Sequence, residues 1–290
     1  MTRTIYREKI PATDPRLKRH VLHDSESRRY AFNTAGLSIV SVEHHRWLPI
    51  LDQGDVGSCT ADAGFGVLGT DPYATSGASQ PIMATFGAFT QAGAYQLYSA
   101  EEQYDGGGPW PPNDNGSSGL TLAKVLRDVG AIAGWTQTFT LDDALKALGQ
   151  YPLAIGTVWF NSMFDPDPQG IITVSRSSGL AGGHEYEAVG YDQPRGLVHL
   201  ANSWGTSWGE SGYFWMAAED LGLLLEDQGD VTVFTPLTNP APVPTPVLVD
   251  ANADDVALAR VLDPWAEAPH VGQNHRAAMA YLQWRATKAL

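Results

Sequence analysis

Cys59 is the only cysteine among the 290 residues of the chain. One thiol can supply neither an internal disulfide nor a metal site built from several thiolates. It follows Gly57 and Ser58, and small and apolar residues continue to Leu68, which favours a helix. Ser58 is a candidate N-cap, so we expect the thiol in the first helical turn, where the positive helix end favours a reactive thiolate. The alternative interpretation is a buried structural cysteine, the commonest fate of a lone thiol.

Two later stretches bear on this choice. They are Gly182-Gly-His-Glu-Tyr-Glu-Ala-Val-Gly-Tyr-Asp192 and Ala201-Asn-Ser-Trp-Gly-Thr-Ser-Trp-Gly-Glu-Ser-Gly-Tyr-Phe214. Together with Gln53-Gly-x-x-Gly-Ser-Cys59 they closely resemble the papain-like (C1) cysteine peptidases. In that family the histidine and asparagine follow the cysteine in this order, about 130–150 residues later, and the separations here are comparable.

The resemblance implies a role for each residue of these motifs. Acyl transfer needs a nucleophile, a base held by a third group, and donors for the developing oxyanion. Cys59 is then the nucleophile and His184 its partner, while Asn202 orients the imidazole. The Gln53 side-chain amide and the backbone N–H of Cys59 donate hydrogen bonds to the oxyanion. Trp204 shields the Asn–His hydrogen bond from water. For His184 considered alone, the alternative is a core histidine with satisfied hydrogen bonds.

Three further positions are candidates for substrate contact. Gly116 and Ser117 lie where the family carries a glycine-containing strip that pairs its backbone with extended substrate, although Asn-Gly is also an ordinary turn signal. Glu185 corresponds to a position that lines the S2 pocket of the family. A carboxylate there favours a basic substrate side chain. The alternative is a strand glutamate that is paired locally or points to water.

The amino-acid composition limits which classes of protein this chain can belong to. Hydrophobic residues make up 43% and charged residues 17%, typical of a globular chain. The formal charge of −14 argues against nucleic acid and membrane as partners. We find neither an apolar run of eighteen residues nor a secretory signal, and together with the single cysteine this predicts synthesis in a reducing cytoplasm. The resemblance implies a site without metal or cofactor.

The chain is expected to contain four parts. Residues 1–48 form an N-terminal arm and 49–235 the catalytic domain. Residues 236–249 form a proline-rich linker, and 250–290 a helical segment that docks on the domain or on a protein partner. Papain-like zymogens carry a longer helical prosegment in the cleft, and the arm is too short and too poor in apolar periodicity to match it. We therefore expect an extended arm that wraps the domain.

Within the catalytic domain, helices are expected first and strands afterwards. Apolar spacing predicts helices over 120–129 and 141–148, the second capped by Thr140, whereas 70–90 is expected to be an irregular insertion. Expected strands cover 153–160, 185–191, 196–201 and 212–216. This order predicts an α+β fold. The papain-like form has a helical lobe and an antiparallel, barrel-like β lobe, with the cleft between them.

The sequence leaves two hypotheses for function. The first is a papain-like peptidase that hydrolyses peptide bonds of a peptide or protein substrate. The absence of disulfides and prosegment favours a bacterial or phage protein, and then peptidoglycan stem peptides are a candidate substrate and the virion a candidate location. The second is a structural or assembly protein on the same scaffold, docked through residues 250–290, with auxiliary or vestigial catalysis.

Overall fold

The computed structural model of the protein describes residues 5–24, 30–75 and 79–237. Its contacts divide the chain into Met1–Asn239 and Pro240–Leu290. The predicted helical segment 250–290, and the linker from residue 238 on, lie outside the described residues. Everything below concerns the first unit.

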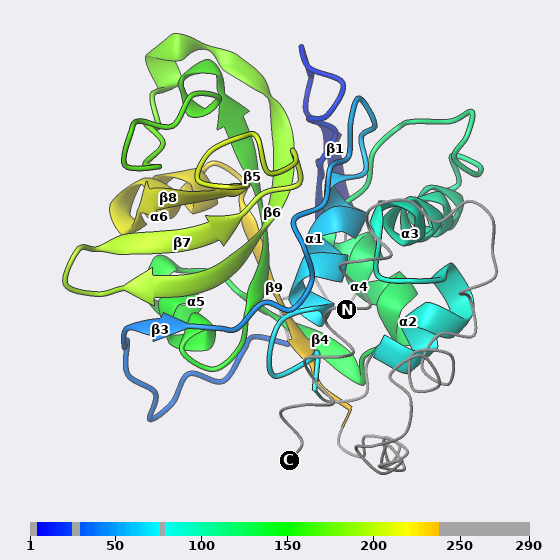
Figure 1. Ribbon diagram of the computed structural model, residues 1–290, viewed down its shortest axis with the longest axis horizontal. Coiled ribbons are helices and arrows are strands. Elements are labelled where there is room, and N and C mark those ends of the chain that lie inside the picture. Colours follow the sequence, from blue (N-terminus) through cyan, green and yellow to red (C-terminus); the bar gives the residue numbers. More distant parts are fainter. Residues whose placement is uncertain (1–4, 25–29, 76–78, 238–290) are drawn as a thin grey trace, which may run out of the picture. The chain divides into compact units, whose positions relative to one another are not determined.

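One half of this unit consists of helices, drawn at the right of Figure 1. Their bounds are α1 Cys59–Leu68, α2 Ser79–Phe86, α3 Gln91–Tyr104 and α4 Gly119–Asp128. All ten residues of α1 are buried, as expected of a helix surrounded by other elements. Gly64 lets α4 approach closely, because a Cβ there would lie 2.5 Å from Leu122 Cδ1.

The other half is built on an antiparallel sheet. Its strands are β3 Val42–Glu43, β4 Gly134–Thr138, β5 Leu153–Phe160, β6 Leu180–Asp192, β7 Leu197–Ala201, β8 Tyr213–Ala217 and β9 Asp230–Thr235. The order is β4-β9-β5-β6-β7-β8, and β3 pairs with β6. The order ends at β4 and β8, so the sheet is not a closed barrel. A hydrophobic core joins this sheet to α5 Leu141–Leu148 and α6 Ala218–Glu226.

The predicted α+β class and two-lobed arrangement are therefore confirmed. The helices over 120–129 and 141–148 are present, and Ser118 and Thr140 cap them through their hydroxyl oxygens. Ser58 precedes α1, but its hydroxyl donates to Asp62 Oδ2 at 2.7 Å instead of capping the helix. The expectation of an irregular segment over 70–90 is wrong, since it contains α2. Ile82 and Phe86, one helical turn apart, bury this helix in the core of the helical half.

The described part of the N-terminal arm contains two strands. Strands β1 Ile5–Lys9 and β2 His20–Asp24 form an antiparallel pair, and Figure 1 shows it standing between the two halves. Two short 3₁₀ turns, Asn161–Met163 and Arg176–Ser178, complete the described elements. No described helix has the length and apolar character needed to cross a bilayer.

A buried ion pair joins the segment before α1 to the sheet. Arg46 Nε lies 2.8 Å from Glu187 Oε2 on β6, and the two side chains are 5% and 1% exposed. Thr70 Oγ1 donates to the other carboxylate oxygen at 2.5 Å. Removing one partner of such a pair leaves an uncompensated buried charge, which costs far more than losing an exposed pair.

We therefore expect Glu187→Ala to lower the free energy of unfolding by about 3–5 kcal/mol, measured by urea denaturation. The matched control is Lys146→Ala, which removes the exposed pair with Asp142 and should cost less than about 1 kcal/mol. Equal losses in the two variants would contradict the structural role of the buried pair.

Candidate active site

Cys59 is the first residue of α1 and is fully buried. The backbone N–H of Glu185 on β6 is hydrogen-bonded to the sulfur and lowers the pKa of the thiol. Burial raises the pKa of the thiol, and this is the larger effect. The carboxyl groups of Glu185, Asp62 and Glu101 raise it further, so that the pKa lies well above its usual value. In this state Cys59 is an uncharged thiol.

His184 lies on β6, and Asn202 directly follows β7. His184 Nε2 is 2.8 Å from Asn202 Oδ1. The same oxygen accepts the backbone N–H of Ser203 at 2.8 Å, which identifies it as the amide oxygen. Because an amide oxygen can only accept, the neutral imidazole carries its proton on Nε2. Its Nδ1 then holds the lone pair, and this buried nitrogen has no hydrogen-bond partner among the described residues.

Aromatic rings enclose the imidazole. Trp204 stacks on it with ring centroids 4.8 Å apart, and Trp159 of β5 meets it edge-on at 5.1 Å. Burial lowers the pKa of His184 to about 4. Asn202 raises it and the nearby Arg16 lowers it further. The imidazole is therefore neutral at physiological pH in this state.

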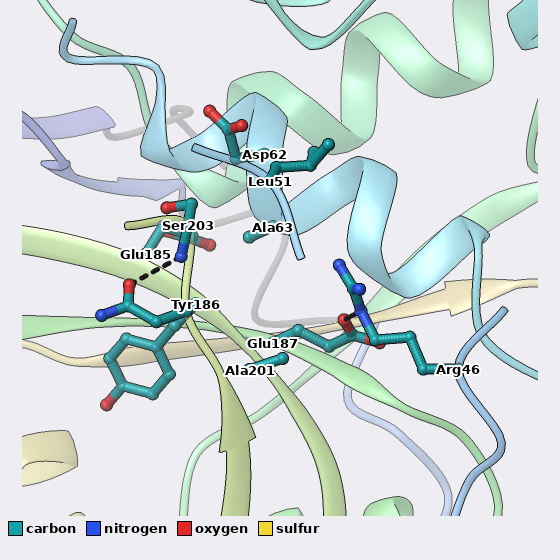
Figure 2. Close-up of a pocket in the computed structure, with 10 residues that line it drawn as sticks. Arg46, Leu51, Asp62, Ala63, Glu185, Tyr186, Glu187, Ala201 and Ser203 are labelled. Atoms are coloured by element: carbon teal, nitrogen blue, oxygen red, sulfur yellow. Dashed lines mark hydrogen bonds and ion pairs between the residues drawn. The ribbon is translucent and has the colours of Figure 1, made fainter. Parts of the chain in front are cut away.

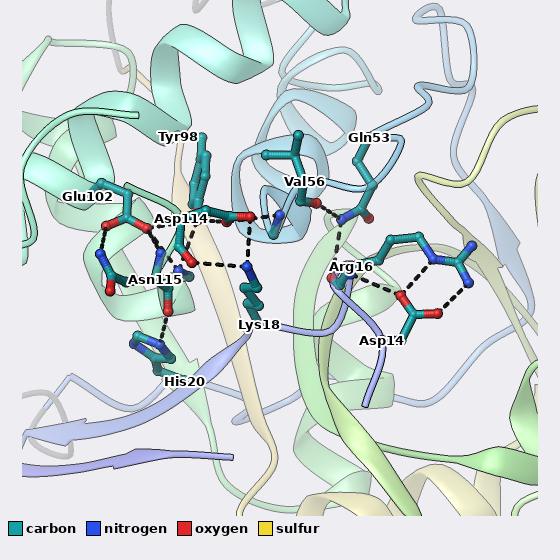
Figure 3. A network of polar contacts seen from close by, with 12 residues as sticks. Asp14, Arg16, Lys18, His20, Gln53, Val56, Tyr98, Glu102, Asp114 and Asn115 are labelled. Carbon is teal, nitrogen blue, oxygen red and sulfur yellow. Dashed lines mark hydrogen bonds and ion pairs between the residues drawn. The ribbon is translucent and has the colours of Figure 1, made fainter. Parts of the chain in front are cut away.

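Gln53 lies in the loop before α1, and its side chain is fully buried. Its Oε1 accepts the hydroxyl of Ser203 at 2.6 Å, which fixes the orientation of the amide. Its Nε2 donates to Val56 O at 2.6 Å and to Arg16 O at 3.2 Å. Figure 3 shows this amide between the two carbonyls. The side chain predicted to serve an oxyanion thus already binds a peptide carbonyl, and that carbonyl belongs to the N-terminal arm.

Residues 13–20 of the arm lie along two segments that form the walls of the site. One wall is the start of β6, with Gly183, and the other is the segment before α4, with Ser117. Arg19 N donates to Gly183 O at 3.0 Å and His20 N to Ser117 O at 2.6 Å. The arm runs parallel to both walls, pairing Lys18 with Gly183 and Arg19 with Ser117. These contacts place residues 13–20 of the arm, expected to wrap the domain, along the candidate site itself. Backbone hydrogen bonds hold it in the site, and they require no apolar helical pattern.

Glycines make room for the arm on both walls. A Cβ at Gly116 would lie 1.9 Å from Lys18 O, and the φ of this residue is +84°. A Cβ at Gly182 would lie 2.6 Å from Leu17 Cβ, and one at Gly183 would lie 2.5 Å from Arg19 O. The candidate strip, Gly116 and Ser117, is thus in backbone contact with an extended peptide, the arm itself.

Three cationic side chains of the arm contact different acidic partners. Figure 3 shows two of these pairs, Arg16 with Asp14 and Lys18 with Asp114. The Arg16 guanidinium pairs with Asp14 and lies 4.2 Å from the Trp204 ring centroid. Lys18 Nζ lies 2.7 Å from Asp114 Oδ2 in the loop before α4. Arg19 is buried beside Asp230 and Glu185.

Glu185 is fully buried and does not point to water. Arg19 Nε lies 3.9 Å from its Oε2. Burial raises the pKa of Glu185 well above its usual value, and Asp230 raises it further, while Arg19 lowers it. Sequence reasoning missed Arg19, Asp230 and Trp159. The run Arg16-Leu-Lys-Arg19 showed only as a charged stretch, and Asp230 begins β9, a strand that was not predicted.

A small cavity lies between α1 and β6, lined by Asp62, Arg46 and residues of β6 and β7 (Figure 2). Burial raises the pKa of Asp62 to about 7. The cavity lining also includes Glu185, Asn202 and Ser203 of the candidate site. Among the described residues, no three His, Cys, Asp or Glu side chains are grouped so that they could hold a metal ion.

Comparisons with known proteins bear on the family and the fold of the chain. Residues 115–226 match the sequence model described as papain family cysteine protease. A peptidase C1-like protein of Acanthamoeba polyphaga mimivirus is 34% identical over 101 residues, 32% of this chain and 32% of that protein. Gamete and mating-type specific protein A of Dictyostelium discoideum is 32% identical over 111 residues, 38% of this chain and 24% of that protein. The chain thus spans a third or less of these relatives.

Among solved structures, xylellain, a cysteine protease from Xylella fastidiosa, is similar in fold. The TM-score is 0.54 at 20% identity, covering 72% of this chain and 91% of that one. At this identity the likeness establishes the fold.

Cys59 labelling measures whether the arm covers the site, because the chain has no other thiol. We expect iodoacetamide to label the native chain slowly and Gly182→Ala at least tenfold faster, since the added Cβ would displace Leu17. Gly134→Ala is the control, because its Cβ would have no neighbour closer than 4.0 Å. Fast labelling of the native chain, or equal rates in all three proteins, would contradict the arm's position.

The titration of His184 should report the same burial. We expect NMR of the native chain to give a His184 midpoint at about pH 4, assigned by the signal lost in His184→Gln. In Gly182→Ala, water reaches the ring and the pKa rises, because hydration favours the charged form. A midpoint near 6.5 in the native chain would mean that the imidazole is already hydrated.

Proposed function

We propose, from the premise that this chain belongs to the papain family of cysteine proteases, that it hydrolyses peptide bonds through Cys59, His184, Asn202 and Gln53. The observation that carries the proposal is the hydrogen bond from the Gln53 amide to the Arg16 carbonyl. A peptide backbone lies along the walls of the groove, and one of its carbonyls is bound by the side chain that the mechanism assigns to the oxyanion.

The groups present are sufficient for acyl transfer. The thiol proton passes to His184 Nδ1, and the sulfur attacks the substrate carbonyl carbon. Gln53 Nε2 and the Cys59 N–H stabilise the oxyanion, the latter because the first N–H groups of a helix have no partner within it. His184 then protonates the leaving amine. Water, deprotonated by His184, hydrolyses the thioester and restores the thiol.

Asn202 and Trp204 would act through His184. Asn202 holds the proton on Nε2, so that Nδ1 faces the proton it must accept. Trp204 covers one face of the ring and keeps water from competing for the His–Asn hydrogen bond. Both are positioning residues in this mechanism.

The arm must leave before a substrate can bind. In the closed state the thiol and the imidazole are both uncharged because both are fully buried. Departure of residues 13–20 would hydrate both groups and remove Arg16 from the neighbourhood of His184. Both changes favour the thiolate–imidazolium pair that attacks the substrate.

The natural substrate is proposed only as a peptide or protein, and peptidoglycan stem peptides remain one candidate. The mimivirus relative favours a viral or bacterial setting, while the Dictyostelium relative places a similar segment in a eukaryotic protein. The assembly hypothesis concerns residues 250–290, outside the described residues, and no observation favours it over catalysis.

The experiment measures hydrolysis of a peptide library by Gly182→Ala, with and without further substitutions. We expect Cys59→Ala to abolish turnover. Gln53→Glu should lower kcat by about 10²–10³, because it removes the oxyanion donor. Gln150→Glu, at an exposed glutamine, is the control and should keep full activity. Turnover that survives Cys59→Ala would refute the proposed mechanism.

A further inference from the structure

Tyr98 and Glu102 are fully buried on α3, one helical turn apart. Side chains at this spacing share a helix face, and here that face meets the loop before α4 (Figure 3). The Tyr98 hydroxyl lies 2.8 Å from Glu102 Oε1 and 2.6 Å from Asp114 Oδ1. Burial raises the pKa of Tyr98 well above its usual value, and Asp114 and Glu102 raise it further, so the phenol keeps its proton. The mechanism above uses none of these three polar side chains.

Glu102 and Tyr98 bind the backbone of the wall before α4. The N–H groups of Asn115 and Gly116 both donate to Glu102 Oε1, the second at 2.9 Å. The Gly116 N–H also donates to the Tyr98 hydroxyl at 2.9 Å, and the Asn115 side chain donates to Glu102 Oε2 at 3.0 Å. Among the described residues, Glu102 has no hydrogen bond or ion pair with the arm. Its effect on the arm can therefore pass only through the wall.

Asp114 binds the loop that leads into α1. Its Oδ1 accepts the N–H of Gly57, two residues before Cys59, at 3.1 Å. A Cβ at Gly57 would lie 2.8 Å from this oxygen, so the glycine makes room for the contact. The other carboxylate oxygen binds Lys18 Nζ of the arm at 2.7 Å. Departure of the arm removes Lys18, whereas the contact with Gly57 joins two parts of the catalytic domain and does not depend on the arm.

We propose that Asp114, Glu102 and Tyr98 are positioning residues of the site. Asp114 holds the loop that directs the Cys59 N–H at the oxyanion, whereas Glu102 and Tyr98 hold the wall at Gly116 against an extended peptide. The inference rests on the proposed function, because it names the residues that position that site. A displacement of about 1 Å at such a site costs roughly 10²-fold in rate, and loops tied to a rigid element are held more precisely than free ones.

The first test compares hydrolysis with alkylation in the full chain carrying Gly182→Ala. Adding Asp114→Ala should lower kcat for a library peptide at least about fivefold, because the oxyanion donor loses its support. The rate of Cys59 alkylation by iodoacetamide should not change, because displacement of iodide from a saturated carbon forms no oxyanion. Asp114→Asn keeps an oxygen for the Gly57 N–H and should restore kcat.

Lys18→Ala is the matched control for Asp114→Ala. It removes the same ion pair from the side of the arm and should not lower kcat. An unchanged kcat in Asp114→Ala, or an equal fall in hydrolysis and alkylation, would overturn the assignment and make Asp114 an anchor of the arm only.

The second test needs no hydrolysis, because the arm is itself a peptide paired with the wall. In the otherwise native chain, Glu102→Ala should raise the rate of Cys59 labelling by iodoacetamide at least about fivefold, since a loosened wall binds the arm less well. Glu102→Gln keeps an oxygen for both N–H groups and should label as slowly as the native chain. Tyr98→Phe, which preserves the buried ring, is the second variant in case Glu102→Ala does not fold, and it should also label faster. Slow labelling of the folded variants would refute the role of these side chains in the wall.

Together the two tests separate this inference from the proposed function. Faster labelling of Glu102→Ala without cleavage of any peptide by Gly182→Ala would uphold the wall assignment and refute the peptidase. Cleavage by Gly182→Ala, with no expected effect of either Asp114→Ala or Glu102→Ala, would uphold the peptidase and refute the positioning role.

Discussion

Exclusion of water by the N-terminal arm is the constraint on which the chemistry of this site depends. Residues 13–20 pair with Gly183 at the start of β6 and with Ser117 before α4, and burial dominates the pKa shifts of both Cys59 and His184. The same closure explains why the walls carry glycines at 116, 182 and 183, where a side chain would collide with the arm. Burial thus accounts for the uncharged forms of Cys59 and His184 in this state.

The fold supplies the assembly from two rigid parts. Cys59 begins a helix that is buried on all sides, whereas His184 lies within the thirteen-residue strand β6, paired with both β5 and β7. Elements of this kind hold side chains more precisely than loops do. The loop residues of the site, Gln53 and Asn202, are instead fixed by hydrogen bonds to Ser203. Ser203 thus links the side-chain amides of Asn202 and Gln53.

Features that depend on short local motifs could be predicted from the sequence. Cys59, His184 and Asn202 stand in local patterns, and so do the helices with clear apolar spacing, such as 141–148. The placement of the arm could not be predicted, because it binds through backbone hydrogen bonds and isolated cations, which leave no periodicity. The Arg19–Asp230 pair joins residues 211 positions apart, and neither residue carries a local signal for the other.

The anchors of the arm differ greatly in how they resist its departure. Arg16 and Lys18 make partly exposed contacts, and such ion pairs are worth about 1 kcal/mol or less. Arg19 is different, because its removal would leave Asp230 and Glu185 buried without a cation, a far larger cost. Arg19 is therefore the contact whose loss most opposes departure of the arm, whereas Arg16 and Lys18 oppose it little.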